Sequence, residues 1–134
     1  MRIGLYGTPS YSDTNKIVKI FTLIRAQNGS FATINSAGND TGADYLVKKL
    51  ALELNYPFKE FNPSYTGKRM YSAMDESYYG KGYHYSHLVD RYKHLIYNSD
   101  YICVFIEKGI KPPKDLQFSL DFAMKKNKKI VIIN

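Results

Sequence analysis

Residues 34–54 read INSAGNDTGADYLVKKLALEL and decide the fold of this chain. The stretch opens as the end of an apolar strand, crosses small and polar residues, and continues as a helix. Apolar residues then recur with helical spacing, at Ala43, Leu46, Val47, Leu50, Ala51 and Leu54. A strand that leads through a turn of small residues into an amphipathic helix is the repeating unit of α/β folds.

The rest of the chain repeats this alternation. Apolar runs predict strands at 2–6, 30–35, 58–61, 101–106 and 129–133. Helical spacing predicts helices up to 28, at 43–54, around 88–98 and at 116–126. Strands that alternate with helices indicate one α/β domain over 1–134, a Rossmann-like three-layer domain with a mainly parallel sheet of five strands. Ligands of such sheets bind beyond the carboxyl ends of the strands, here at Gly7-Thr8, at 36–42 and after Ile106.

Residues 62–83 interrupt the alternation. The segment is punctuated by glycine and proline and has no sustained period, apart from one short helix expected near 72–77. Loops of this length in compact domains are commonly functional. We therefore expect an excursion that could serve as a flap over a ligand site.

Charge and composition restrict the classes of partner. The 134 residues carry a formal net charge of +7, which favours an anionic partner such as a nucleotide or a nucleic acid. Residues 108–129 hold seven lysines against Asp115 and Asp121, which is also compatible with a simple solvated basic face. The chain contains neither a membrane-length apolar run nor a signal peptide pattern, so we expect a cytoplasmic protein that does not bind membranes. Cys103 is the only cysteine and lies in an apolar run, which predicts a buried structural thiol.

The turn before the second helix is the first candidate site. A helix N-terminus carries unpaired N–H groups and a partial positive charge, and glycines let an anion approach the backbone. We expect a phosphate over 38–43 and near Gly7-Thr8. The expected ligand-binding residues of this turn are Gly7, Thr8, Ser36, Ala37, Gly38, Thr41, Gly42, Ala43 and Asp44. The alternative is purely structural, with Thr41 as an N-cap, Asp44 as a first-turn acid and the glycines serving the turn. The pattern is neither a P-loop nor a G-x-G-x-x-G fingerprint.

The stretch GNDTGADYLVKKLALELNYPFKEF resembles the SLOG superfamily, and more narrowly its YspA/YpsA-related branch. The matching features are Gly7-Thr8, Gly42-Ala43-Asp44, Leu46, Ala51, Arg91 nine residues before Asp100, and the strand YICVF. The resemblance implies a Rossmann-like nucleotide-binding domain, for which we expect the strand order 3-2-1-4-5. The chain departs from the family at Ser36-Ala37, where a Gly-Gly pair is usual, and at Tyr92, where Asn follows the Arg. Its last loop, KPPKDLQF, also lacks the second Gly-Thr motif.

Catalytic patterns of related architectures do not match. Nucleoside deoxyribosyltransferases place a Glu four residues before an Ala in the last helix, and here that position is Ser119. The Pro-Gly-Gly-x-Gly-Thr-x-x-Glu motif of cytokinin-activating phosphoribohydrolases does not occur in the sequence. His84, His87 and His94 have no cysteine or carboxylate signature to complete a zinc site. We predict no catalytic residue, no metal and no cofactor.

Tyrosines and cations concentrate in the region from 71 to 97, which holds seven of the thirteen tyrosines. Such mixtures stack on bases and bind phosphates. We expect Tyr79 and Tyr83 to stack on a base, and Arg91 and Lys93 to balance its phosphate. An AT-biased genome would also enrich tyrosine, and exposed tyrosines are common in subunit interfaces, so a homo-oligomer is an open alternative.

These patterns favour a protein that binds a nucleotide-type small molecule, sensing or sequestering it without chemistry. Sequestration would suit a viral protein directed against nucleotide-based immunity. Two other functions stay open: an enzyme that processes nucleotides or nucleosides, and a binder of single-stranded nucleic acid related in fold to DNA-processing protein A.

Overall fold

The computed structural model describes residues 1–29 and 31–134. Its strands are β1 (Arg2–Gly7), β2 (Thr33–Ser36), β3 (Phe58–Glu60), β4 (Tyr101–Phe105) and β5 (Lys129–Ile133). Its helices are α1 (Thr14–Asn28), α2 (Gly42–Glu53), the 3-10 turn η1 (Glu76–Tyr78), α3 (Tyr85–Tyr97) and α4 (Lys114–Lys125). All strand pairs are parallel and the order is β3-β2-β1-β4-β5, which confirms the predicted fold class and strand order.

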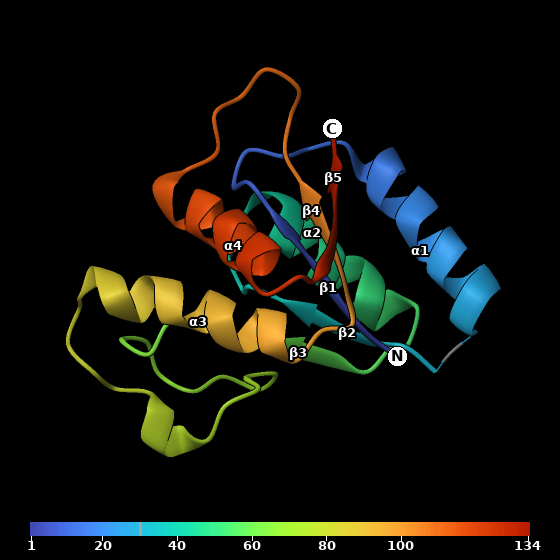
Figure 1. Ribbon diagram of the computed structural model, residues 1–134. Coiled ribbons are helices and arrows are strands. Elements are labelled where there is room, and N and C mark those ends of the chain that lie inside the picture. Colours follow the sequence, from blue (N-terminus) through green and yellow to red (C-terminus); the bar gives the residue numbers. More distant parts are fainter. Residues whose placement is uncertain (30) are drawn as a thin grey trace.

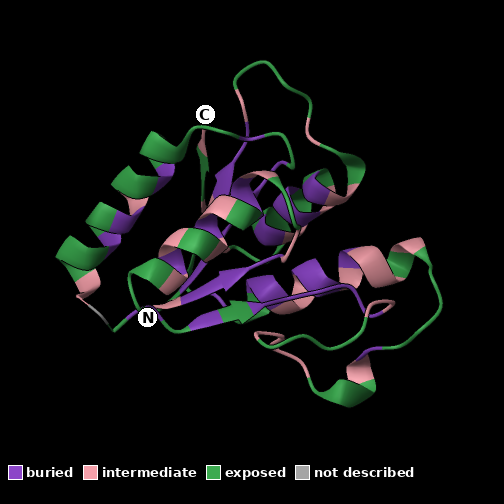
Figure 2. Cartoon of the chain, turned by 180° about the vertical axis from the view of Figure 1, so that it is seen from behind, coloured by how far each residue is buried: buried purple, intermediate pink, exposed green. Residues whose placement is uncertain are grey.

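The helices cover the two faces of the sheet in pairs (Figure 1). Helices α1 and α2 bury Ile17, Phe21 and Val47 against one face, in a cluster that includes Leu5 and Ile34 of the sheet. Helices α3 and α4 bury a second cluster on the other face. Figure 2 shows the consequence, since the helix sides turned toward the sheet are buried and the outer sides are exposed. The change of face occurs between β1 and β4, which makes this pair the topological switch point.

Local signals explain where the helices begin and end. Helix α1 starts after Asp13, whose side chain accepts a hydrogen bond from the Lys16 N–H at 3.2 Å, and it stops at Gly29 with φ of 58°. Helix α3 starts three residues earlier than its apolar spacing suggests, because the His84 side chain caps it by accepting from the Ser86 N–H. No described helix combines the length and the apolar character that a membrane crossing requires.

The strand β5 lies at the edge of the sheet, and about half of the Val131 and Ile132 surface is exposed. In the neighbouring strand Cys103 is partly buried, and this burial raises the pKa of its thiol. The predicted buried thiol is therefore only partly covered.

Residues 62–83 follow a defined path along the ends of β3 and α3. Two hydrogen bonds close the segment on itself, from the Gly80 N–H to the Thr66 carbonyl at 3.1 Å and from the Lys81 N–H to the Ser64 carbonyl at 3.0 Å. The short helix expected near 72–77 is wrong in position. Ser72 and its neighbours pair with Glu60 of β3 instead, and only the 3-10 turn Glu76–Tyr78 is helical. Motion of this segment as a flap stays a prediction.

Candidate functional site

The first part of the site is the switch-point turn, which we define as Gly7, Thr8, Gly42, Ala43 and Asp44. The backbone here is paired internally. The Ala43 N–H donates to the Thr8 carbonyl at 3.1 Å, and the Thr8 N–H donates to the Phe105 carbonyl at 3.0 Å. Thr41 precedes α2 as its N-cap but forms no side-chain capping bond. The N–H groups of Thr8 and Ala43 are therefore engaged by the protein itself.

The two glycines of the switch-point turn serve close packing of the backbone. Gly42 has φ of 70°, and a Cβ placed on it would clash with the Thr8 carbonyl oxygen and with Pro9. A Cβ on Gly7 would clash with the Phe105 carbonyl oxygen. Only glycine permits this approach of chain segments, so the structural interpretation accounts for both positions.

Asp44 joins the parts of this turn. Its carboxylate accepts from the Gly7 N–H and from the Asn39 N–H, each at 3.1 Å. The side chain is fully buried. Burial raises the pKa of Asp44 to about 6, against the opposing effect of Arg91 and of the two N–H donors. The carboxylate thus occupies donors that a bound phosphate would otherwise use.

A second carboxylate lies at the end of β4. Glu107 accepts hydrogen bonds from the hydroxyls of Thr8 and Ser10. Burial acts to raise the pKa of Glu107, but the bonds from Ser10 and Thr8 outweigh it and lower the pKa. With Asp44 beneath and Glu107 beside it, the switch point is negatively charged and its hydroxyls are engaged.

Arg91 lies under the next section of the turn. It is 2 % exposed, and its guanidinium donates to the Ala37 carbonyl at 2.6 Å, to the Tyr92 hydroxyl at 3.3 Å and to Asp115 at 3.5 Å. Arg91 therefore holds the turn in place, and its Nε is a buried donor without a partner among the described residues.

The second part of the site is the turn pocket, a cavity of about 390 Å³ beyond the ends of β2 and β3. It lies between the turn at 38–40, the excursion at 62–69 and helix α3, which contributes Leu88 and Arg91. Lys68, Arg69 and Arg91 line it, together with one acid, Asp40. The lining of the turn pocket is positively charged, in contrast to the switch point.

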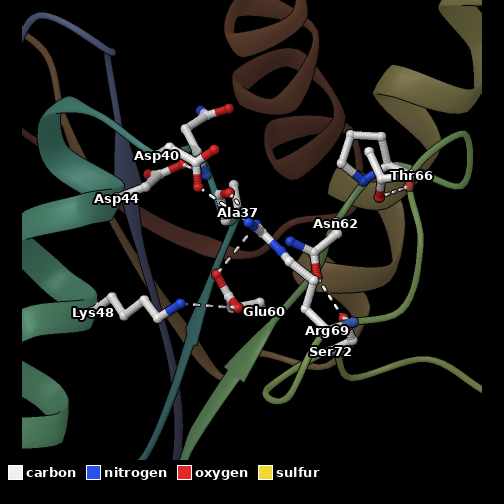
Figure 3. Close-up of polar contacts among 12 residues, drawn as sticks. Ala37, Asp40, Asp44, Lys48, Glu60, Asn62, Thr66, Arg69 and Ser72 are labelled. Carbon is white, nitrogen blue, oxygen red and sulfur yellow. Dashed lines mark hydrogen bonds and ion pairs between the residues drawn. The ribbon is translucent and has the colours of Figure 1, made fainter.

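Arg69 fastens the excursion to the turn (Figure 3). Its guanidinium donates to the Gly38 carbonyl at 2.9 Å and to Asp40 at 3.1 Å, and it lies 3.6 Å from the buried Glu60. Lys48 reaches the other oxygen of Glu60 at 3.4 Å. The excursion thus contributes a cation that faces the turn from the side opposite α2.

Three buried polar groups near this turn have no partner among residues 1–29 and 31–134. They are the Asn62 amide nitrogen, the Arg91 Nε and the Ser36 hydroxyl. The Asn62 oxygen accepts from the Ser72 hydroxyl at 2.8 Å, which turns the amide nitrogen toward Gly38. Gly38, with φ of 80°, has no room for a side chain beside that amide. Buried donors are nearly always satisfied in folded proteins, so these groups indicate a place for a ligand or water.

The predicted aromatic residues lie in different environments. Tyr83 is 71 % exposed and packs edge-on against Tyr65, with ring centroids 5.0 Å apart. Tyr65 itself lines the turn pocket. Tyr79 is buried beside Tyr78, and its hydroxyl has no partner among the described residues. The Tyr65 ring of this pair therefore lines the same pocket as Lys68, Arg69 and Arg91.

Lys93 is not brought to the pocket. Its ammonium lies 5.9 Å from the ring centre of Phe118 and 6.0 Å from that of Phe122, both on α4. Conversely, sequence reasoning missed Asn62, Tyr65 and Arg69. Their only signal was a place in the long excursion, because the contacts that assemble them join segments far apart in the chain.

Other candidate chemistry finds no support in the geometry. Ser119, at the position of the deoxyribosyltransferase Glu, accepts a hydrogen bond from the buried Tyr6 hydroxyl at 3.1 Å. His84 and His87 have ring centroids 6.0 Å apart. Across the described part of the chain, three or more His, Cys, Asp or Glu side chains do not gather into a cluster that could hold a metal ion.

Comparisons with protein-family models, curated proteins and solved structures find no match to this chain. The resemblance to the SLOG superfamily stays a prediction that rests on the quoted residues.

Proposed function

We propose that this protein binds a nucleotide or a nucleotide-derived signalling molecule in the turn pocket and releases it unchanged, as a sensor or a sequestering protein. The observation that carries the proposal is the pairing of cations with unsatisfied buried donors in one cavity. Lys68, Arg69 and Arg91 line it, and the Asn62 amide and the Arg91 Nε lack partners among the described residues.

The chemistry of the lining matches a phosphate with an attached ring. Guanidinium groups and amide N–H donors bind phosphate oxygens through charge-assisted hydrogen bonds. The Tyr65 ring at the pocket offers an apolar face for a base, and Tyr83 supports it from outside. The resemblance to the SLOG superfamily contributes the expectation that the anion is a nucleotide.

The positions and bonding partners of Asp40 and Asp44 favour binding without chemistry. Asp40 is the acid among the residues that line the turn pocket, and it is exposed and paired with Arg69. A general acid or base needs a carboxyl group that is aimed at the ligand and has a suitably shifted pKa. Asp44 has a raised pKa, but it is buried beneath the turn and bonded to two backbone N–H groups.

The test is a calorimetric titration with nucleoside monophosphates, diphosphates and cyclic nucleotides, with inorganic phosphate and free nucleosides as partial ligands. Arg69→Gln should weaken the best nucleotide about 10-fold, the effect of losing one charge-assisted hydrogen bond. Lys59→Gln removes an equal charge from an exposed position outside the pocket and should leave the affinity within about 2-fold.

Chromatography of the recovered ligand checks the second half of the proposal. An intact nucleotide supports a binder, whereas release of free base or phosphate would show an enzyme. Equal affinities for the two variants, or the lack of saturable binding by any nucleotide at millimolar concentration, would overturn the pocket assignment.

A further inference from the structure

A second anion-attracting surface lies on the outer side of α3 and α4, which we call the basic–aromatic seam. Its residues are spaced four apart on each helix and so share one side of it. They are Lys93 and Tyr97 on α3, Lys114, Phe118 and Phe122 on α4, and Lys126, the residue that caps the end of α4. This surface shares no residue with the lining of the turn pocket.

Lysines and rings alternate along the seam. Lys114 lies 4.7 Å from the ring centre of Tyr85 at the start of α3. Lys93 lies over Phe118 and Phe122, and these two rings stack with an interplanar angle of 15°. At the far end, Lys126 lies 5.8 Å from the ring centre of Tyr97, which is 51 % exposed.

The acids near the seam are engaged elsewhere. Asp90 accepts from the Tyr78 hydroxyl at 3.0 Å and lies 3.2 Å from His94. Asp115 faces Arg91 at 3.5 Å, and Asp121 accepts from the Gln117 amide at 3.0 Å.

The positive charges of the seam lysines are therefore not neutralised by acids of the described chain. Within the described chain, Lys93, Lys114 and Lys126 face aromatic rings and form no ion pair. The charges of Lys114 and Lys126 belong to residues 108–129, where seven lysines stand against two acids.

We infer that the seam binds single-stranded nucleic acid, with phosphates on the lysines and bases against the rings. The twelve residue steps from Tyr85 to Tyr97 span about 18 Å of helix, which is enough for a few nucleotides. Cations interleaved with aromatic faces are the arrangement that binds single strands with little sequence preference. Carboxylate side chains would use the lysines but do not stack on the rings, so the rings favour nucleic acid over an acidic polypeptide.

The experiment measures fluorescence anisotropy of a labelled twelve-residue thymidine oligonucleotide that lacks a terminal phosphate. The triple variant Lys93→Gln, Lys114→Gln, Lys126→Gln should weaken binding at least about 20-fold at 50 mM salt. The control triple Lys16→Gln, Lys19→Gln, Lys49→Gln removes the same charge from α1 and α2 and should change the affinity less than about 3-fold. Tyr97→Leu keeps an apolar side chain, removes the ring and should weaken binding about 5-fold.

The unmodified protein provides a test that needs no variant. For three phosphate contacts on a single strand, the affinity should fall about 20-fold between 50 and 200 mM salt. Equal effects of the two triple variants would reduce the binding to general charge and overturn the inference. Competition by polyglutamate at the same charge concentration, with Tyr97→Leu unchanged, would assign the seam to an acidic polypeptide and also overturn it. Arg69→Gln should leave oligonucleotide binding unchanged, so the seam and the turn pocket can fail independently.

Discussion

The switch-point turn and the turn pocket lie at the same edge of the sheet but differ in the sign of their charge and in their unsatisfied donors. At the switch point, the Thr8 and Ala43 N–H groups are bonded within the protein, and Asp44 and Glu107 bring negative charge. In the pocket, arginines and a lysine bring positive charge, and buried donors of Asn62 and Arg91 lack partners among the described residues.

The difference teaches how to interpret a strand–glycine–helix turn. Such a turn binds an anion only where its N–H groups remain free, and here the Thr8 carbonyl and the Asp44 carboxylate take several of them. The glycines at 7 and 42 serve backbone packing. The buried donors without partners among the described residues lie one strand further along the edge, where the excursion meets the turn.

The largest expected effect comes from placing a side chain in the switch-point turn. Gly42→Ala adds a Cβ against the Thr8 carbonyl in a left-handed backbone conformation. We expect the free energy of unfolding to fall by about 3 kcal/mol or more, measured by urea denaturation.

Two other glycines distinguish the cost of a positive φ from the cost of a steric clash with an added Cβ. Gly80 also has a positive φ, of 80°, but open space around it, so Gly80→Ala should cost only about 1–2 kcal/mol. Gly67 has neither constraint, and Gly67→Ala should be close to neutral. If the Gly42 and Gly80 variants cost the same, the backbone clash at the switch point contributes nothing, and the structural explanation of Gly42 is wrong.

The next effect is a dependence of stability on pH that originates in Asp44. Its pKa is raised to about 6 by burial, so the folded state binds this proton more tightly than the unfolded state does. The resulting contribution is complete below the unfolded pKa near 4 and is lost as the pH rises through 6. We expect the free energy of unfolding to fall by about 2 kcal/mol between pH 4.5 and 7.5.

Asp44→Asn should abolish most of this slope, since the amide does not titrate in this range. Asp100 and Glu107 provide an internal contrast, because their pKa values are lowered and their contributions are lost at more acidic pH. A slope of the same size in Asp44→Asn would place the titrating group elsewhere.

Periodicity was sufficient to predict the strands and the main helices, because each is a local pattern in the sequence. It could also have excluded Lys93 from the pocket. Two residues after Arg91 correspond to about 200° around a helix, so the two side chains face opposite sides. Asn62 and Arg69 could not be predicted, since their partners Ser72, Gly38 and Glu60 are reached only through the tertiary path of the excursion. The sequence also could not show that the Ala43 N–H is engaged, because its acceptor, the Thr8 carbonyl, follows a different strand.

The smallest expected effect compares two equally buried serines, one with hydrogen-bond partners and one without any in the described chain. Ser119 accepts from the Tyr6 hydroxyl and donates to the Leu116 carbonyl at 2.6 Å, so Ser119→Ala leaves Tyr6 unpaired and should cost about 1–2 kcal/mol.

The Ser36 hydroxyl has no partner in the described chain, so Ser36→Ala should leave the free energy of unfolding within about 0.5 kcal/mol of the unmodified value. A large loss of stability in Ser36→Ala would show that the hydroxyl already contributes to the fold, and this result would remove the contrast between the two regions. If stability is kept, the nucleotide affinity of Ser36→Ala decides its role: a weaker affinity assigns the hydroxyl to the ligand, and an unchanged affinity assigns Ser36 to the fold alone.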